Sequence, residues 1–513
     1  MSDRSRTEYS ARNTSVAVTA RMIAILTGFI TRVVFTHTLS ETYVGLNGLF
    51  TDILNILSLS ELGVGTAVTC ALYRPISEKN IEKQKSLMGM YRIMYRYIAA
   101  IVLICGLAII PFMDILIKDG EGIEHLILIY LMYLLNSVLS YLLVYKKTLI
   151  EAHQLSYIGV LCQTGFLLLQ YVLQIILLFL TKNFLLYVSA MILCTLGNNL
   201  WISHKAEKMY PYLKDKNIQP LSSKERKGIF ADIRAMLMHK IGTIVVNNTD
   251  NLLLSSLVGL TSVSCYSNYY LIIGSVRQVL NQIFQGITAS VGNLGVEESR
   301  ERVKRIFEAT FFMGQWVFGL AAICLYEVID AFVGISFGEQ YIFTKDITLI
   351  LCVNFYLTGM RQAALVFRDS IGLFRHDRYK SIAEAIINLV VSFVLGRTMG
   401  TLGIFIGTMV STVTTSLWVE PYILYRYHLR CTSRWYFVRY AVYASVTAAL
   451  GAVTHWACSR VTGPFIVIFI FRLAICAVIV NGAYFIIYCR TEEYHLLWEK
   501  GKGILKKWTR HQK

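Results

Sequence analysis

The fold is decided near the start of the chain, where residues 13–34 read NTSVAVTARMIAILTGFITRVV. A helix rises 1.5 Å per residue, so about 20 mainly apolar residues cover the hydrocarbon layer of a bilayer. The apolar region of a secretory signal peptide has only ~7 to 15 residues, and this run is longer. It follows a polar segment with Arg4, Arg6 and Arg12. We therefore expect a first membrane-spanning helix over residues 13–37.

The composition of the whole chain agrees with a membrane protein. Of its 513 residues, 55% are hydrophobic and only 16% are charged, and the mean hydropathy is +0.53. Soluble domains carry roughly 25% charged residues and about 45 to 50% apolar ones. These values exclude an ordinary soluble, disordered or collagen-like protein.

Further runs of the same kind predict fourteen spans in all. They cover residues 13–37, 44–72, 90–113, 125–145, 157–180, 184–203, 230–258, 263–292, 307–329, 346–367, 380–396, 402–425, 435–457 and 464–489.

Charge in the loops supports this count, because cytoplasmic loops are enriched in Lys and Arg. If the N-terminus is cytoplasmic, the outer loops contain few basic residues: Lys118, Lys182, Lys345, Arg397 and Arg460. The two longest outer loops contain acidic residues: Asp114, Asp119, Glu121, Glu124, Glu327, Asp330, Glu339 and Asp346. We expect both termini in the cytoplasm. The net charge of +17 is then explained by topology and anionic lipid headgroups, with no need for nucleic acid.

Similar patterns recur about 219 residues apart and predict two related halves. Thr31-Arg32 corresponds to Thr249-Asp250, for example. The predicted organisation is a six-helix bundle (1–203), a basic cytoplasmic linker (204–229), a second six-helix bundle (230–430), two additional helices (431–490) and a basic cytoplasmic tail (491–513).

Polar side chains recur along four of the predicted spans. A charged side chain at mid-membrane costs at least ~2.5 kcal/mol, so it should face a cavity or a partner. Arg21 and Arg32 are 11 residues apart and share one helix face. The other polar stripes are Asn47, Thr51, Asn55 and Ser58, with Asp52 and Glu61 nearby; Lys240, Thr243, Asn247 and Asn251, flanked by His239 and Asp250; and Arg277, Asn281 and Gln285.

Two interpretations of these residues remain open. The first is helix packing, with Arg32 paired to Asp52 and Arg21 paired to Glu61. The second is an anion-binding central cavity, because the cations outnumber the acids near mid-depth and an unpaired buried cation is costly. The candidate cavity residues are Arg21, Arg32, Asn55, Lys240, Asn247, Arg277, Asn281 and Gln285. The candidates for coupling to an ion gradient are Asp250, Asp52 and Glu61, and for Asp250 an ion pair with Arg32 is an equal alternative.

No motif for enzymatic chemistry stands out. The sequence contains no GxxxxGK[ST] loop for nucleotide phosphates and no HExxH metal motif. The 11 cysteines form no CxxC pair and fall mostly in apolar runs. We expect neither a metal nor a cofactor, and no enzymatic activity.

Several segments resemble bacterial polysaccharide flippases of the Wzx type. These segments are YVGLNGLF (43–50), LSLSELGVG (57–65), LYRP (72–75), GLFRHDRY (372–379), EAIINLV (384–390) and GIFIGT (403–408). The resemblance covers nearly the whole chain.

This resemblance implies a fold and a substrate. The fold is the MATE-like fold of the multidrug/oligosaccharidyl-lipid/polysaccharide (MOP) superfamily, with two bundles around a central cavity. The implied substrate is an undecaprenyl-pyrophosphate-linked oligosaccharide, which is turned from the inner to the outer leaflet of the bacterial cytoplasmic membrane during O-antigen or capsule synthesis. Partners would be membrane lipids, a polysaccharide polymerase and glycosyltransferases. The alternatives are a lipid-linked peptidoglycan-precursor flippase, a MATE-like drug or cation antiporter, and a scaffold for glycan assembly.

Overall fold

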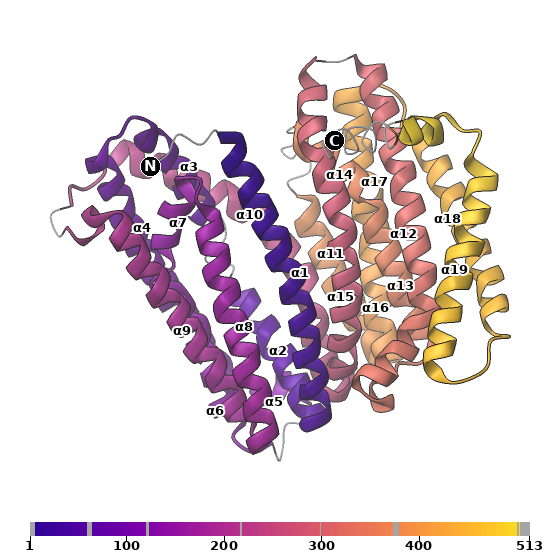
Figure 1. Cartoon of the computed structure of the whole chain (residues 1–513), viewed down its shortest axis with the longest axis horizontal. Coiled ribbons are helices and arrows are strands. Elements are labelled where there is room, and N and C mark those ends of the chain that lie inside the picture. The colour runs from indigo at the N-terminus through magenta and orange to yellow at the C-terminus, as the bar shows by residue number, and fades with distance from the viewer. Residues whose placement is uncertain are drawn as a thin grey trace, which may run out of the picture. The chain divides into compact units, whose positions relative to one another are not determined.

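The computed structural model describes residues 6–58, 64–118, 123–215, 218–297, 299–371, 373, 379–499 and 502 (Figure 1). For residues 6–15, 66, 70, 232, 234–247, 285–297 and 465 it describes the backbone alone. The described residues form helices and turns and contain no β-strand. The all-α fold expected from the sequence is confirmed. The chain divides into two compact units, Met1–Ser264 and Cys265–Lys513, and each is described by itself.

Unit 1 contains the first ten α-helices and the start of an eleventh. They are α1 (Arg6–Thr38), α2 (Glu41–Leu57), α3 (Val64–Ser77), α4 (Ile81–Ile109), the 3₁₀ turn η2 (Ile110–Phe112), α5 (Met113–Leu116), α6 (Leu126–Leu142), α7 (Tyr145–Ala152), α8 (Ser156–Thr181), α9 (Phe184–Met209), the 3₁₀ turn η3 (Pro211–Lys214), α10 (Ser223–Leu253), the π-helical segment η4 (Leu254–Val258) and α11 (Leu260–Glu297).

Side-chain caps fix several helix starts in unit 1. Asn80 accepts a hydrogen bond from the Lys83 backbone N–H at the start of α4. Ser222 and Glu225 form a capping box at the start of α10, in which each side chain accepts from the other residue's backbone N–H. These caps satisfy backbone donors that a helix start otherwise leaves without a partner.

The helices of unit 1 pack along one another, and tyrosine hydroxyls form hydrogen bonds between them. The helix α8 packs along both α1 and α9, and α6 packs along α4 and α9. The Tyr130 hydroxyl on α6 donates to the Gly106 carbonyl on α4 at 2.8 Å. Tyr133, one turn further along α6, donates to Asn47 Oδ1 on α2 at 2.5 Å. These two buried tyrosine hydroxyls thus bond α6 to α4 and to α2.

The predicted linker, residues 204–229, is docked on α4. The Tyr212 hydroxyl donates to Gln84 Oε1 at 2.6 Å, Lys85 pairs with Asp215 at 2.8 Å, and Lys83 pairs with Glu225. The described part of this segment is therefore held against α4.

Unit 2 contains the rest of α11 and eight further α-helices. They are α12 (Arg300–Phe337), the 3₁₀ turn η5 (Glu339–Tyr341), α13 (Lys345–Met360), α14 (Gln362–Ile371), α15 (Lys380–Met399), α16 (Thr401–Ser411), the π-helical segment η7 (Thr412–Ser416), α17 (Leu417–Ile423), the π-helical segment η8 (Leu424–Leu429), α18 (Arg434–Cys458) and α19 (Phe465–Tyr488).

In unit 2, α12 packs along α13, α18 and α19. Gln315 on α12 is fully buried and bonds to several of these helices. Its amide donates to Thr447 Oγ1 on α18 at 2.8 Å and to the Tyr484 hydroxyl on α19 at 3.2 Å. It accepts from the Tyr356 hydroxyl on α13 at 2.7 Å. This network fixes the two C-terminal helices to the rest of the unit.

The chain is a multi-pass membrane protein. Ten helices among the described residues are long and apolar enough to cross a bilayer, or eleven if α6 and α7, bent by 43°, count as one span. The predicted number of fourteen stays a prediction. One cause of the difference is visible in the predicted span 44–72, which is divided between α2 and α3, of 17 and 14 residues.

One part of the predicted outer surface is wrong. The prediction placed Glu327 and Asp330 around the end of a span at residue 329, as acids of an outer loop. The helix α12 continues to Phe337, and both side chains are buried. Asp330 accepts hydrogen bonds from the hydroxyls of Tyr269 and Thr348, at 2.6 and 2.7 Å, and pairs with Lys345 at 2.6 Å. These partners allow the carboxylate to be buried.

Candidate functional site

The predicted site residues fall on three helices of unit 1 and one of unit 2. Arg21 and Arg32 lie on α1, Asp52 and Asn55 on α2, Lys240, Asn247 and Asp250 on α10, and Arg277, Asn281 and Gln285 on α11. For Lys240, Asn247 and Gln285 the structure describes the backbone alone, and Glu61 lies outside the described residues. That all these residues form one cavity stays a prediction.

Within unit 1, the polar stripes of α2 and α10 meet. Asn251 Nδ2 donates to Asp52 Oδ2 at 2.6 Å, and Asn55 Nδ2 donates to Asn248 Oδ1 at 3.4 Å. Asn251 belongs to the polar stripe predicted for this span, whereas Asn248 was missed because it lies off the aligned face. The structure therefore brings a predicted coupling carboxylate, Asp52, against amides of α10.

Two of the predicted site cations, Arg32 and Arg277, have guanidinium groups close to aromatic rings. The Arg32 guanidinium is 5.7 Å from the centre of the Phe35 ring, which stacks on Tyr187 at 4.8 Å. The Arg277 guanidinium is 5.6 Å from the centre of the Tyr270 ring. The negative face of an aromatic ring attracts a cation, so these rings help to hold the two guanidinium groups in place. Arg21 and Asn55 are exposed.

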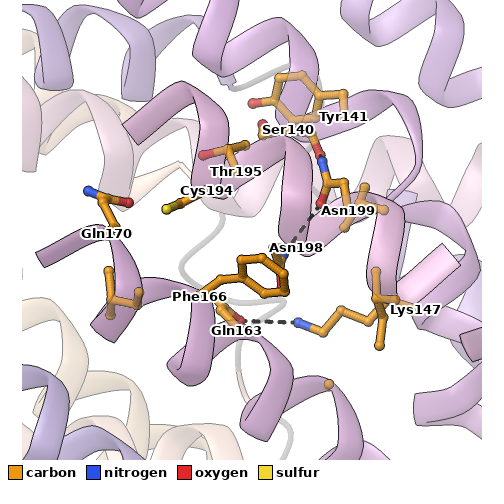
Figure 2. A pocket seen from close by; sticks show the side chains of 14 residues that line it. Ser140, Tyr141, Lys147, Gln163, Phe166, Gln170, Cys194, Thr195, Asn198 and Asn199 are labelled. Atoms are coloured by element: carbon orange, nitrogen blue, oxygen red, sulfur yellow. Dashed lines mark hydrogen bonds between the residues drawn. The ribbon is translucent and has the colours of Figure 1, made fainter. Parts of the chain in front are cut away.

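Unit 1 also contains a polar pocket of about 350 Å³ that the sequence did not suggest (Figure 2). Its lining comes from the end of α6, the start of α7 with the residue before it, and the middle portions of α8 and α9. The lining residues are Ser140, Tyr141, Val144, Lys147, Gly159, Gln163, Phe166, Leu167, Gln170, Cys194, Thr195, Asn198, Asn199 and Ile202. The signal that was available is the spacing of Gln163 and Gln170 on α8 and of Asn198 and Asn199 on α9, within otherwise apolar spans.

A second group that the sequence analysis missed is a buried cluster of charges in unit 2. Glu420 on α17 is fully buried and accepts from Arg361 through both oxygens, at 2.8 and 3.2 Å. It also pairs with Lys380, and Arg368 lies 3.8 Å away. Arg361 bonds Glu384 on α15 at 3.3 Å. Glu420 and Glu384 each interrupt an apolar stretch, which is the signal that marks them.

The helix that carries Glu420 is irregular on both sides of it. The π-helical segments η7 and η8 flank α17, and Ser416 at the end of η7 donates to Glu384 Oε2 at 2.5 Å. A π-helical turn is rare and frequently marks a functional position. Here the two segments place Glu420 in the interior of unit 2, against the cations of α14 and α15.

A third buried carboxylate, Glu327, holds α12 to the two C-terminal helices. His455 Nδ1 on α18 lies 2.8 Å from Glu327 Oε1, and the Arg472 guanidinium on α19 donates to the Glu327 carbonyl at 3.2 Å. Among the described residues, no group of three or more His, Cys, Asp or Glu side chains has the geometry of a metal site.

The comparisons with known proteins identify the fold. No protein-family model matches the sequence, and no curated protein matches it either. Among solved structures, the lipid II flippase MurJ in an inward closed conformation is similar with a TM-score of 0.66 at 13% identity, covering 92% of this chain and 98% of MurJ. An inward-facing multidrug resistance MATE transporter of the MOP superfamily has a TM-score of 0.62 at 15% identity, covering 80% of this chain and 97% of its own. A mutant of the Vibrio cholerae MATE transporter VcmN has a TM-score of 0.53 at 14% identity, covering 82% of this chain and 99% of its own.

At these identities the likeness establishes the fold alone. The chain has the MATE-like fold of the MOP superfamily, as expected from the sequence. The solved proteins named above are a flippase and two transporters.

Proposed function

We propose that this protein is a flippase for lipid-linked oligosaccharides. It turns an undecaprenyl-pyrophosphate-linked glycan from the inner to the outer leaflet of the bacterial cytoplasmic membrane by alternating access, for polysaccharide synthesis. It carries out no covalent chemistry. Its ligands are the glycolipid and membrane lipids, and a polysaccharide polymerase and glycosyltransferases act beside it.

The observation that carries this proposal is the extent of the structural likeness. The match to a flippase of a lipid-linked precursor covers 92% of this chain, whereas the two MATE transporters cover 80% and 82%. The chain ends in two apolar helices, α18 and α19, beyond the two predicted six-helix bundles, and buried hydrogen bonds from Gln315 anchor them. Additional helices of this kind suit a substrate with a long hydrocarbon tail.

The charges favour an anionic head group. A pyrophosphate carries at least two negative charges, and moving it through hydrocarbon without counter-charges is prohibitive. Arg21, Arg32 and Arg277 supply guanidinium groups, which bind phosphate oxygens through two parallel hydrogen bonds. Asn55 and Asn281 supply amides for sugar hydroxyls. An antiporter of cationic drugs would instead favour acidic groups.

The runner-up substrate is a lipid-linked peptidoglycan precursor, because the MurJ structure carries that substrate in its name. The decisive experiment compares two fluorescent substrates in proteoliposomes: an undecaprenyl-pyrophosphate oligosaccharide and lipid II. An impermeant quencher measures exchange between leaflets. We expect exchange of the oligosaccharide lipid by the wild type. Exchange of lipid II alone would replace the proposed substrate, and exchange of neither would refute the function.

The same assay tests the cations. Arg21→Ala and Arg277→Ala should abolish exchange while the protein stays in the membrane, and the Arg→Lys variants should retain part of it, since Lys binds phosphate only as a point charge. Lys208→Ala, which removes an exposed cation at the end of α9, is the matched control. Normal exchange by both Arg→Ala variants would defeat the anion-site hypothesis.

Directional transport would draw on an ion gradient or on membrane potential, which is worth ~2.3 kcal/mol per charge per 100 mV. We propose Asp52 and Asp250 as ion-responsive groups, with Glu61 as a third candidate. The buried contact between Asp52 and Asn251 supports Asp52, because the carboxylate meets an amide there. Exchange measured under imposed pH, Na⁺ or voltage gradients tests them. Asp250→Asn with unchanged rate and unchanged gradient dependence would exclude Asp250.

A further inference from the structure

The polar pocket of unit 1 is separate from the predicted cavity residues, since none of them lines it. We propose that this pocket binds one anionic sugar unit, a sugar phosphate or a uronic acid, and that it is a glycan-recognition site of the flippase. This inference rests on the proposed function in one respect, namely that the protein transports a glycan. The recognition chemistry follows from the pocket itself.

The size and shape of the pocket suit a small ligand. Its volume of about 350 Å³ lies at the lower end of the range for small-molecule sites, roughly 300 to 1,000 Å³. Phe166 supplies a flat apolar face (Figure 2). Its ring packs directly on Gly197, where a Cβ would lie only 2.6 Å from Phe166 Cε1. A sugar ring presents C–H groups on its face and hydroxyls around its edge, and this lining offers partners for both.

The polar groups of the pocket have hydrogen-bonding capacity left for a ligand. Lys147 Nζ lies 3.4 Å from Gln163 Oε1 and 3.4 Å from Glu151 Oε1. A bond from an ammonium group to a carboxylate is ordinarily ~2.7 to 2.9 Å long, so both contacts are weak. Asn198 Nδ2 lies 3.4 Å from Asn199 Oδ1, again a long contact. A side-chain amide can donate two hydrogen bonds and accept two, so the amides of Gln163 and Asn198 match the hydroxyls of a sugar.

The charge of the pocket favours an anion. Among the described residues of its lining, Lys147 is the one cation and none carries a carboxylate. Glu151, whose carboxylate lies 3.4 Å from Lys147 Nζ, belongs to α7 and is not a lining residue. A ligand with a phosphate or carboxylate group would therefore replace a weak contact of Lys147 by a strong one.

The structure also separates residues that shape the pocket from residues that face a ligand. Asn199 is buried and donates to the carbonyls of Leu139 and Ser140, at 2.9 and 3.3 Å, so it ties α9 to α6. Gly159 sets the position of Lys147, because a Cβ there would lie 2.8 Å from Lys147 Cε. Gly159→Ala should push this flexible side chain aside while keeping its charge.

The test measures binding of soluble probes to the purified full-length protein by isothermal titration calorimetry. The probes are glucose 1-phosphate, glucuronate, glucose, inorganic phosphate and glycerol 3-phosphate. The variants are Lys147→Met, Gly159→Ala and Asn198→Leu. The matched control is Lys208→Met, which removes a cation of α9 outside the pocket. Loss of a charge-assisted hydrogen bond, worth about 1.5 to 3 kcal/mol, corresponds to a roughly ten- to hundredfold weaker affinity.

We expect glucose 1-phosphate or glucuronate to bind the wild type at least tenfold more tightly than glucose or inorganic phosphate. Lys147→Met should remove the preference for the anionic sugar, Gly159→Ala should reduce it, and Asn198→Leu should weaken both charged and neutral sugars. Lys208→Met should bind as the wild type does.

Three results would overturn the inference: no binding of either anionic sugar, equal affinity for inorganic phosphate, or equal affinity for glycerol 3-phosphate with both lost in Lys147→Met. The last result would assign the pocket to a phospholipid head group. Leaflet exchange in proteoliposomes separates this inference from the proposed function. If the wild type exchanges the oligosaccharide lipid but binds no sugar probe, only the pocket assignment fails. If sugar binds but no lipid is exchanged, only the flippase proposal fails.

Discussion

Replacing Glu420 by Gln should destabilise unit 2 far more than replacing an exposed glutamate. Glu420 is fully buried and is bonded by Arg361 and Lys380, with Arg368 3.8 Å away. Glutamine keeps the shape of the side chain but removes its charge. The positive charges of Arg361, Arg368 and Lys380 are then balanced by fewer carboxylates, of which Glu384 is one.

The expected magnitude follows from the burial of these partners. Removing one partner of a buried ion pair costs about 3 to 5 kcal/mol, because it leaves a desolvated charge without compensation. That corresponds to a shift of roughly two to three and a half orders of magnitude in the unfolding equilibrium. The free energy of unfolding can be measured by titrating the purified protein with SDS and following tryptophan fluorescence. Glu492→Gln, an exposed glutamate after α19, should change it by less than about 0.5 kcal/mol.

A second substitution tests the cause. If excess positive charge is responsible, Lys380→Met should destabilise less in the Glu420→Gln background than in the wild type, and the double-mutant cycle should give a coupling energy of at least about 1 kcal/mol. Glu420→Gln with wild-type stability, or additive effects of the two substitutions, would refute the reasoning.

The remaining predictions concern other parts of the chain. Gln315→Leu should cost about 1 to 3 kcal/mol in the same SDS titration, because the buried Tyr356 hydroxyl loses its acceptor; an unchanged midpoint would contradict the network described here. A cysteine at position 339 should react with an impermeant maleimide on spheroplasts while one at position 208 should not, and equal labelling would refute the predicted topology. Asp52→Asn should keep the bond to Asn251 but make leaflet exchange insensitive to an imposed pH or Na⁺ gradient, and retained sensitivity would remove Asp52 from the coupling group.

The fold was predictable because hydrocarbon imposes a length and a composition on each spanning helix. The helices α1, α8 and α9 follow the predicted spans 13–37, 157–180 and 184–203 closely. Helix ends were less predictable. The helix α12 runs on past residue 329 because Glu327 and Asp330 find partners inside the unit, which loop composition cannot reveal.

The candidate site was predictable only in part. Helical periodicity aligns residues of one helix, so Asn55, Asp52 and the polar face of α10 were found. It says nothing about which helices pack together. The pocket around Lys147 and the cluster around Glu420 each require several helices to meet, and they became visible only in the structure. The π-helical segments beside Glu420 also shift side chains away from the ideal helical spacing.

The charge cluster has a consequence for synthesis of the protein. Arg361 and Glu420 are 59 residues apart in the chain, and a ribosome adds about 5 to 20 residues per second, so the arginine is made roughly 3 to 12 s before its main partner. Glu384 arrives earlier but supplies only one contact to Arg361. Until α17 emerges, the nascent segment around α13 and α14 carries cations that hydrocarbon disfavours. We therefore expect these helices to settle in the bilayer as a group, once α17 has been made and Glu420 can balance their charge.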